Sequence, residues 1–423
     1  MKVFEHDHIK HNENSEFTEE HWRALSDFND KNENKYFTIT AKGVKFSQYV
    51  GVVQIGKLTI EILPKIDKST VDTEENKDIW HNVLLKMLKV CHRIQSDSLT
   101  TADLKLRSNS ILDWYIEIFL KETEHLLHQG LVKKHRKIDG NSNALKGQLL
   151  FSKHITQNLI HKEHFFVRHT NYDRNNTYNR ILNKTLLLIK NISTNPLLHS
   201  QIGRISLDFP EVSDIYVNDE LFEKLKYDRK TERYKKAIEI SRLLLLNYSP
   251  DIKQGRNNVI ALLFDMNKLW EEYITIMLRK ACEAEKWKLL SQRKHTFWNS
   301  QHFSNKRLQP DIIIEKPNNE RIAIDTKWKM IDIKGPSEED LRQVFAYGEY
   351  FVANNVYLLY PFDKVLLQKG EFNSEKFNSD FKTEISTKNG SILYVNVLNG
   401  DKLNSEIGNE IFEKLLESQE IVT

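Results

Sequence analysis

The chain has 423 residues, 39% of them hydrophobic and 29% charged, which is enough apolar material for two or three folded domains. Its 62 lysines and arginines nearly balance 59 aspartates and glutamates, so the net charge of +3 excludes nucleic-acid binding driven by overall charge alone. The two cysteines provide neither a disulfide framework nor a metal motif, and no apolar run reaches membrane-spanning length. We therefore expect a cytoplasmic protein that does not contact a membrane.

Residues 1–75 are expected to form a β-rich N-terminal domain. A helix is predicted over residues 18–28, where a threonine and two acidic residues precede the first apolar positions. Strands are predicted over 36–41, 48–55 and 58–63, and the last two are expected to pair as a hairpin.

The predicted hairpin contains a string that resembles the start of a phosphate-binding loop. Gly51 to Lys57 fits the spacing G-x-x-x-x-G-K, but the serine or threonine that should follow is Leu58. A phosphate-binding loop also joins a strand to a helix, whereas this string alternates like a strand and precedes another strand. We therefore expect no nucleotide site here and no motor in this chain.

Residues 76–255 are expected to form a mostly helical middle domain. Helices are predicted over 80–94, 111–128 and 175–192, because apolar residues recur along one face of each segment. Residues 165–173 are expected to be extended. We find no recognisable catalytic motif in this half of the chain.

The C-terminal domain, residues 256–423, is organised around a predicted hairpin over residues 308–329. Its first strand is the short apolar run 312–314, and Pro-Asn-Asn-Glu at 317–320 provides the turn. Its second strand alternates over 321–328.

Three charged side chains are expected to meet at one end of this hairpin. Asp325 and Lys327 are two residues apart on the second strand and share a face, and strand pairing can bring Asp311 beside them. Carboxylate oxygens are ligands for Mg²⁺, and the ammonium can orient or deprotonate a water or offset phosphate charge. Thr326 is expected to face the other way and to contribute only its backbone. The pattern predicts a metal-dependent hydrolytic site, with a solvated surface hairpin as the alternative.

This arrangement resembles the PD-(D/E)xK nuclease signature. Pro310-Asp311 provides the PD, and Asp325-Thr326-Lys327 provides the DxK. The resemblance implies a restriction-endonuclease-like α/β core, in the order helix, hairpin, helix, strand. The fold expected for the whole chain is therefore α+β, with a β-rich and helical N-terminal region followed by this core.

Two flanking helices complete the resemblance. In these nucleases an acidic residue on the preceding helix often joins the metal site, and Glu271 matches that position, while Glu272 is expected to be solvated. Gln343 and Tyr347 are four residues apart on the following helix and share a face. They resemble the Q-x-x-x-Y helix that lies beside the active site in one branch of these enzymes.

Several strings between residues 36 and 360 resemble McrC, the nuclease subunit of McrBC-type modification-dependent restriction systems. They are ILPKI at 62–66, GLVKKHR at 130–136, LKGQLLF at 145–151, NYDRNNTYNRILNKTL at 171–186 and RYKKAIEISRLLLL at 233–246. The resemblance implies a McrB-like AAA+ GTPase hexamer as partner, stimulated by this chain, and methylated double-stranded DNA as substrate. The hairpin over 48–63 and the polar segment 68–77 are the expected contacts with that partner.

Two other functions remain open at this stage. One is a non-catalytic NTPase activator whose nuclease fold only clamps DNA, and the other is a RecB-like repair nuclease that works on ends. Basic residues flank the predicted nuclease core and are expected to contact phosphates: Arg293, Lys294, Lys306 and Arg307. No ladder of alternating aromatic and basic residues indicates sequence readout.

Overall fold

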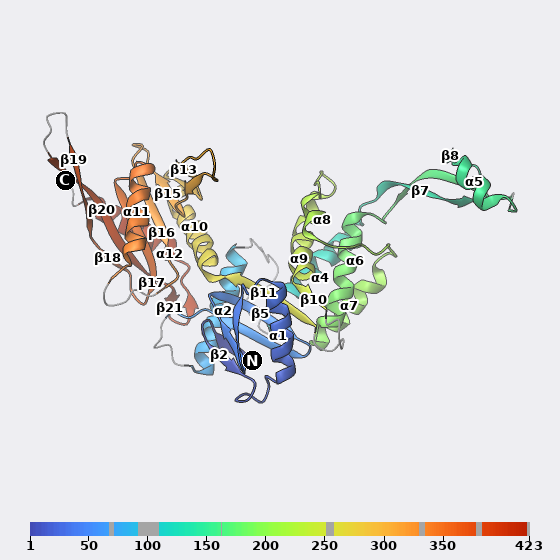
Figure 1. Ribbon diagram of the computed structural model, residues 1–423, viewed down its shortest axis with the longest axis horizontal. Coiled ribbons are helices and arrows are strands. Elements are labelled where there is room, and N and C mark those ends of the chain that lie inside the picture. Colours follow the sequence, from blue (N-terminus) through green and yellow to red (C-terminus); the bar gives the residue numbers. More distant parts are fainter. Residues whose placement is uncertain are drawn as a thin grey trace.

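The computed structural model describes residues 1–66, 72–91, 110–161, 163–250, 258–329, 335–377 and 383–420. A central part formed by N-terminal strands lies between a C-terminal α/β body and a helical part, from which a narrow arm projects (Figure 1). Helices and several separate sheets are combined, as an α+β chain predicts. In the described residues no helix is long and apolar enough to cross a membrane.

The central part is built on a sheet whose described strands follow the order β1-β6-β5-β11-β10. These strands are β1 (Lys2–Phe4), β5 (Tyr49–Ile55), β6 (Leu58–Leu63), β10 (Tyr248–Ser249) and β11 (Val259–Asp265). Strand β11 follows the expected domain boundary at residue 256, yet it pairs with β5 along its whole length. Residues 251–257 lie outside the described residues, and the division into 1–75, 76–255 and 256–423 remains a prediction.

Strands β5 and β6 form the predicted hairpin, which turns at Gly56 and Lys57. Gly51 lies in β5 with a φ of +136°, and a Cβ there would come within 2.0 Å of the carbonyl oxygen of Leu262 in β11. The glycine therefore permits the close approach of two strands. The string that resembles a phosphate-binding loop is a strand and a turn, which explains its spacing without a nucleotide.

A small second sheet and one helix cover a face of the central sheet. The small sheet has the order β2-β4-β3 in the described residues. Its elements and the helix are β2 (His8–Lys10), β3 (Phe37–Thr40), β4 (Gly43–Phe46) and α1 (Glu19–Lys31). Their apolar side chains share one core with the outward face of β5 and β6. The helix predicted over 18–28 and the strand predicted over 36–41 are confirmed.

The helical part contains most of the middle of the chain. Its elements are α4 (Ile111–His128), α6 (Thr177–Ile192), α7 (Pro196–Asp208), α8 (Asp219–Glu223), the 3-10 turn η1 (Glu232–Tyr234) and α9 (Lys235–Leu246). Helix α2 (Glu74–Cys91) lies outside this part and packs on α10 and the central sheet (Figure 1). Ser110 and Asn176 cap α4 and α6, because each side chain accepts a hydrogen bond from a backbone N–H of the first turn. The helices predicted over 111–128 and 175–192 are confirmed, and α2 confirms the third as far as Cys91. Residues 92–94 of that prediction lie outside the described residues.

The arm is a long antiparallel ribbon that ends in a short helix, and it extends away from the body (Figure 1). Its elements are β7 (Lys134–Ser142), β8 (Gln148–Leu149), α5 (Phe151–Asn158) and β9 (Phe165–Asp173). Strand β9 pairs with both β7 and β8. The extended segment predicted over 165–173 is confirmed, and pairing with β7 explains it.

The C-terminal body is a sheet between two helical layers. The sheet has the order β12-β15-β16-β17-β20-β18, with β19 paired to β20. Its strands are β12 (Lys288–Ser291), β15 (Ile312–Glu315), β16 (Arg321–Thr326), β17 (Asn355–Phe362), β18 (Leu366–Gln368), β19 (Glu371–Phe377) and β20 (Thr383–Asn396). The other elements are α10 (Met266–Ala284), α11 (Glu338–Tyr350), α12 (Ile407–Glu420) and two small hairpins, β13 (His295–Trp298) with β14 (Lys306–Leu308) and β21 (Leu398–Asn399) with β22 (Lys402–Leu403).

Successive side chains along the strands of this sheet point to opposite faces, and each face packs against its own helix layer. Ile312 and Ile324 belong to the same core as α10 and α12, whereas Ile313 and Ala323 pack with α11. Burial on both faces accounts for the uninterrupted apolar runs in these strands. Helix α11 connects β16 to β17, which lie parallel in the sheet.

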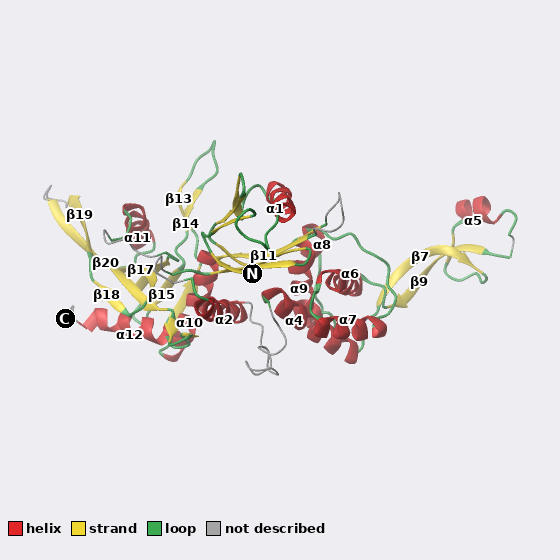
Figure 2. Ribbon diagram, turned by 90° about the horizontal axis from the view of Figure 1, so that it is seen from below, coloured by secondary structure: helices red, strands yellow, loops and turns green. Residues whose placement is uncertain are grey.

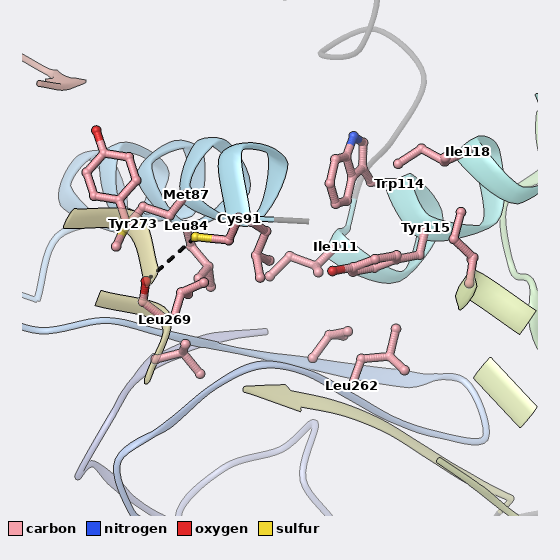
Figure 3. Close-up of a cluster of buried hydrophobic side chains, with 14 of the residues drawn as sticks. Leu84, Met87, Cys91, Ile111, Trp114, Tyr115, Ile118, Leu262, Leu269 and Tyr273 are labelled. Carbon is pink, nitrogen blue, oxygen red and sulfur yellow. Dashed lines mark hydrogen bonds between the residues drawn. The ribbon is translucent and has the colours of Figure 1, made fainter. Parts of the chain in front are cut away.

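One continuous core joins the three parts of the molecule. Helices α2, α4 and α10 and strand β11 contribute to it (Figure 3). Cys91 at the end of α2 lies with its Sγ 3.7 Å from the carbonyl oxygen of Leu269 in α10. Helix α10, which leads into the C-terminal body, is therefore packed against α2, which itself packs on the central sheet.

Candidate active site

Two carboxylates lie at the open end of the β15–β16 hairpin. Strand β15 begins just after Asp311, Asp325 is the last residue but one of β16, and the ladder pairs Ile312 with Ile324 beside them. The backbone N–H and the hydroxyl of Thr326 both donate to Asp311 Oδ2, at 2.7 and 2.8 Å. The expectation that the Thr326 side chain faces away is therefore wrong. It fails because the strand pairing ends at Ile312, which leaves the Asp311 carboxylate free to reach the end of the neighbouring strand.

Lys327 connects this hairpin to helix α11. Its Nζ lies 2.8 Å from Asp325 Oδ2 and 3.4 Å from Asp340 Oδ1. It also donates a hydrogen bond of 2.9 Å to Gln343 Oε1. The backbone N–H of Lys327 donates to the carbonyl oxygen of Leu359 in β17, which holds this residue on the sheet beyond the end of β16. The Lys327 ammonium is therefore held between two carboxylates and an amide.

The Gln343 and Tyr347 side chains extend the network from α11 back to the hairpin. Gln343 Nε2 donates to the Tyr347 hydroxyl at 2.7 Å, and that hydroxyl donates to the Gln309 carbonyl oxygen at 3.1 Å. Ser337 caps the helix by accepting from the Asp340 N–H. The two residues share a face as predicted, and their hydrogen bonds join Lys327 to the segment that precedes Asp311.

Glu271 approaches the carboxylates from α10. It is half-buried, and its Oε1 accepts a hydrogen bond of 3.2 Å from Gln292 Nε2, while the backbone N–H of Gln292 donates to the Asp311 carbonyl oxygen at 3.1 Å. Glu272, the next residue, is exposed. The structure thus places Glu271 on the site side of α10 and Glu272 on the solvent side.

Burial and mutual repulsion weaken the acidity of these carboxyls. Burial raises the pKa of Asp311 to about 6, and the Glu271 charge adds to the effect. Burial likewise raises the pKa of Asp325 to about 6, with a contribution from Asp311. Burial opposes the charge of Lys327, but Asp325 and its other acidic neighbours outweigh it and raise the pKa of Lys327. Lys327 therefore stays protonated at neutral pH, while the carboxylates carry an unfavourable charge that a cation would relieve.

Asp325→Asn is expected to stabilise the chain in the absence of divalent metal. A carboxyl whose pKa rises from its ordinary value of 3.8 to about 6 on folding contributes stability that is lost as the pH rises through 6. The amide cannot ionise, so the variant should be more stable by roughly 3 kcal/mol above pH 7. Thermal melting in EDTA at several pH values measures this difference, which should shrink as the pH falls below 6. A variant that melts below the parent at neutral pH would show that the Asp325 charge is favourable without metal.

The sequence as a whole matches one family model. Residues 44–361 fit the model described as McrBC 5-methylcytosine restriction system component. The chain belongs to the McrBC family. The resemblance predicted from the sequence is thus confirmed, and the matched residues include the site from Glu271 to Tyr347.

One solved structure contains a chain with the fold of this McrBC-family chain. A chain of the half-complex of Thermococcus gammatolerans McrB AAA+ hexamers with bound McrC superposes with a TM-score of 0.65 at 18% identity, over 98% of this chain and 99% of that chain. A chain of the Thermococcus gammatolerans McrBC complex has a TM-score of 0.47 at 20% identity, over 66% of this chain and 87% of that chain. No curated protein matches the sequence. The first similarity shows that the fold extends over essentially the whole chain.

The carboxylates of this McrBC-family chain have the chemistry of ligands for a hard divalent cation. Asp325 Oδ2 is buried and has no aligned hydrogen bond, although Lys327 lies close to it. Among the described residues, no three His, Cys, Asp or Glu side chains lie close enough together to enclose a metal ion. A small cation such as Mg²⁺ does not need such an enclosure, because one or two carboxylates with waters and substrate phosphates commonly hold it. Asp311 and Asp325 therefore fit such an ion, and Glu271 acts on them at least through its charge.

Asp340, a buried acidic residue in the first turn of α11, was not predicted from the sequence to belong to the site. Besides Lys327, it contacts the Lys329 ammonium and accepts a hydrogen bond of 3.3 Å from the Tyr360 hydroxyl in β17. Burial opposes its ionisation, but the hydrogen bonds from Lys329 and Ser337 keep the pKa of Asp340 below its ordinary value. An acidic first turn is typical of helix N-termini, so the sequence offered a sufficient and different explanation for this residue.

A second missed residue, Glu5, ties the start of the McrBC-family chain to the site. Trp328 follows Lys327, and its indole N–H donates to Glu5 Oε1 at 2.7 Å. Burial raises the pKa of Glu5 to about 7, and the N–H of Lys65 also donates to its carboxyl. The Trp328 ring packs on Trp270, the residue before Glu271. The central sheet therefore contacts the site through the residue next to Lys327.

Proposed function

We propose that this chain is the nuclease subunit of a McrBC-like restriction complex, a Mg²⁺-dependent endonuclease that cuts methylated double-stranded DNA together with a McrB-like AAA+ GTPase. The observation that carries this proposal is the convergence of Asp311, Asp325 and Lys327 at one end of a buried hairpin, with Lys327 held by Gln343. This grouping agrees with a PD-(D/E)xK core. A surface hairpin with a solvated charge pair would not bury these carboxylates.

The carboxylates are assigned to the metal. Asp311 and Asp325 would hold Mg²⁺, with Glu271 assisting from α10. When bound, Mg²⁺ would stabilise charge on the phosphate and increase the acidity of a water. Asp311 keeps one oxygen engaged by the N–H and hydroxyl of Thr326, so its carboxylate plane is fixed before any ligand arrives. Such fixed ligands avoid reorganisation during the reaction.

Lys327 is assigned to the scissile phosphate and the attacking water. Because its pKa is raised, it acts as a cation and donor rather than as a base. Gln343 accepts a hydrogen bond from one of the three N–H groups of the Lys327 ammonium. The Gln343 side chain is itself oriented by its hydrogen bond to the Tyr347 hydroxyl. Lys327 thus positions a water or neutralises the phosphate, while Gln343 and Tyr347 keep it in place.

Lys327→Met is expected to lower the cleavage rate about a hundredfold, because a positioned cation at the developing charge is lost. Mg²⁺ binding should persist, since a protonated lysine is not a metal ligand. Single-turnover cleavage of a labelled duplex and calorimetric titration with Mg²⁺ measure the two effects separately.

Lys329→Met is the matched control for this experiment, because Lys329 lies two residues away and pairs with Asp340 rather than with Asp325. The control should cut DNA at nearly the parental rate. Loss of Mg²⁺ binding in Lys327→Met as complete as in Asp325→Ala would show that the role assigned to Lys327 is wrong.

The tip of the arm is the surface that best fits the AAA+ partner. Five of its apolar side chains are exposed by 60 to 86%: Leu145, Phe151, Ile155, Leu159 and Ile160. Clustered exposed apolar residues on a projecting element are typical of protein contact sites. A similar fold was solved with McrB AAA+ hexamers and bound McrC, which supports a motor as the partner of this chain.

The contact expected at residues 48–63 fits this role less well. Strand β5 lies between β6 and β11, and most side chains of both hairpin strands are buried. A strand inside a sheet has no free edge or face to offer a partner. Of the expected contact segment 68–77, residues 68–71 lie outside the described residues, and α2 begins at Glu74.

The two other functions have less support. A chain that only clamps DNA and activates an NTPase has no need for the complete set of Asp311, Asp325 and Lys327. A RecB-like nuclease that works on ends would not account for the match of residues 44–361 to a restriction-system component.

A further inference from the structure

The hairpin β13–β14 projects from the C-terminal body and is rooted at the candidate active site. Figure 2 shows it extending from the body beside α11. The Gln292 N–H donates to the Asp311 carbonyl oxygen, so the two ends of the segment 292–311 meet at the site. The Tyr347 hydroxyl, which belongs to the Lys327 network, donates to Gln309 at the end of the hairpin. A duplex held along the hairpin would therefore reach the carboxylates at its base.

The base of the hairpin is fixed on α11 by aromatic contacts. The His295 ring lies 5.5 Å from the Tyr350 ring and 5.8 Å from the Phe351 ring, measured between centroids. The Phe297 ring lies 6.0 Å from that of Tyr350. The direction of the hairpin is therefore set by the helix that also carries Gln343.

The hairpin carries positive charge without any compensating acid of its own. Residues 292–309 contain no aspartate or glutamate, whereas the whole chain has nearly equal numbers of acidic and basic residues. Its basic residues are all exposed: Arg293, Lys294, Lys306 and Arg307. Arg293 lies 3.7 Å from Glu315, and within the described residues the other three make no ion pair. Such a local excess of cations is complementary to a phosphate backbone.

Large aromatic side chains stand exposed at the end of the same hairpin. Trp298 is 43% exposed and Phe303 is 73% exposed. The connecting loop is held in shape by Ser300, whose hydroxyl oxygen accepts from the N–H groups of His302 and Phe303. A register shift between Thr296 and Trp298 marks a bulge, which redirects side chains at the end of the strand. An ordered loop thus presents aromatic rings to solvent, where hydration disfavours them.

We propose that the β13–β14 hairpin is a DNA-binding wedge that holds duplex DNA against the active site. Lys294, Lys306 and Arg307 contact backbone phosphates, and Trp298 and Phe303 insert against the bases and locally unstack them. Aromatic stacking tolerates any base, which suits a subunit that cuts where it is placed. This inference rests on the proposed nuclease function and adds the element that grips the substrate.

The test measures DNA binding by the full chain in the Asp325→Ala background, so that the duplex stays intact. The probe is a short fluorescein-labelled duplex, and a second copy carries 2-aminopurine to report unstacking. Trp298→Ala/Phe303→Ala is expected to weaken binding about tenfold with an unchanged salt dependence, and to abolish the rise in 2-aminopurine emission. Lys294→Ala/Lys306→Ala/Arg307→Ala should weaken binding. It should also make the plot of the log binding constant against log salt concentration less steep, by about three in slope.

Matched variants separate a specific contact from general damage. Tyr216→Ala/Leu207→Ala removes two exposed apolar side chains from the helical part and should bind DNA like the parent. Trp298→Phe/Phe303→Tyr keeps both rings and should restore binding. Circular dichroism checks the fold of each variant, which these exposed substitutions should leave intact.

Two results would overturn the wedge. The first is parental affinity and parental 2-aminopurine emission in Trp298→Ala/Phe303→Ala, which would assign the aromatic tip to a protein contact instead. The second is failure of the Asp325→Ala parent to bind duplex DNA even at low salt. Failure of the nuclease proposal looks different, because the chain with Asp325 present would then bind DNA through the hairpin but never cut methylated DNA even with the AAA+ partner, Mg²⁺ and GTP.

Discussion

Asp325→Ala is expected to reduce DNA cleavage at least about a thousandfold, because it removes a ligand from the proposed metal site. Without metal the Asp325 charge is unfavourable in the folded chain, so its removal should leave the fold intact and the loss should be confined to chemistry. Binding to the AAA+ partner should remain, since the arm tip lies at the far end of the molecule from the C-terminal body (Figure 1). The measurement is the cleavage rate of a labelled duplex across a range of Mg²⁺ concentrations, together with co-elution with the partner.

Asp363→Ala is the matched control for this substitution. Asp363 follows β17, the strand beside β16, and its side chain is exposed. It offers the same residue type after the neighbouring strand, with a side chain that faces solvent, and should cut DNA like the parent. Mg²⁺-dependent cleavage at the parental rate by purified Asp325→Ala would remove the basis of the assignment.

Phe151→Ser/Ile155→Ser/Leu159→Ser is expected to abolish assembly with the AAA+ protein and stimulation of its GTPase activity. The three side chains recur every four residues along and just after α5, so they share one face, and each is more than 60% exposed. Truncating apolar side chains at the centre of a protein contact commonly weakens binding far more than truncating residues at its rim. Size-exclusion chromatography of the mixture and a GTPase assay measure the two losses.

Leu197→Ser/Leu207→Ser serves as the control for the arm, because both leucines are exposed on α7 in the helical part. This variant should assemble and stimulate like the parent. If the triple arm variant assembles equally well, the partner contact lies elsewhere on the chain. The triple variant should still bind Mg²⁺, since the arm is remote from Asp311 and Asp325.

The local parts of the site were predictable from the sequence. Asp311, Asp325 and Lys327 are grouped by one short hairpin, and strand periodicity assigns them to one end of it. Gln343 and Tyr347 are grouped by one turn of helix. In both cases the spacing along the chain determines the spacing in the structure, so no knowledge of the tertiary fold was needed.

The parts that sequence analysis missed depend on distant pairing. Strand β11 joins β5 across the whole helical part, and no local pattern distinguishes that partner from another buried strand. Asp340 and Glu5 contact the site only after the sheet and α11 are packed. The Thr326 hydroxyl was misplaced because the alternation rule was applied beyond the last paired residue of the hairpin.

The same limit applies to the β13–β14 hairpin. The sequence shows its basic residues, but Trp298 and Phe303 are separated from Lys294 and Arg307 along the chain and showed no ladder. The hairpin fold brings these groups onto one projecting element beside Asp311. Its charge and its aromatic tip became a single feature only in three dimensions.

Cleavage of a supercoiled plasmid tests the central claim most directly. The reaction combines the purified chain, methylated or unmethylated plasmid, Mg²⁺ and GTP, with and without a McrB-like AAA+ protein, and Asp325→Ala serves as the reference. Linear product is expected only when the parental chain, the partner, Mg²⁺ and methylated DNA are all present. Equal and vigorous cleavage of both plasmids by the chain alone, or cleavage by Asp325→Ala as fast as by the parent, would contradict this expectation.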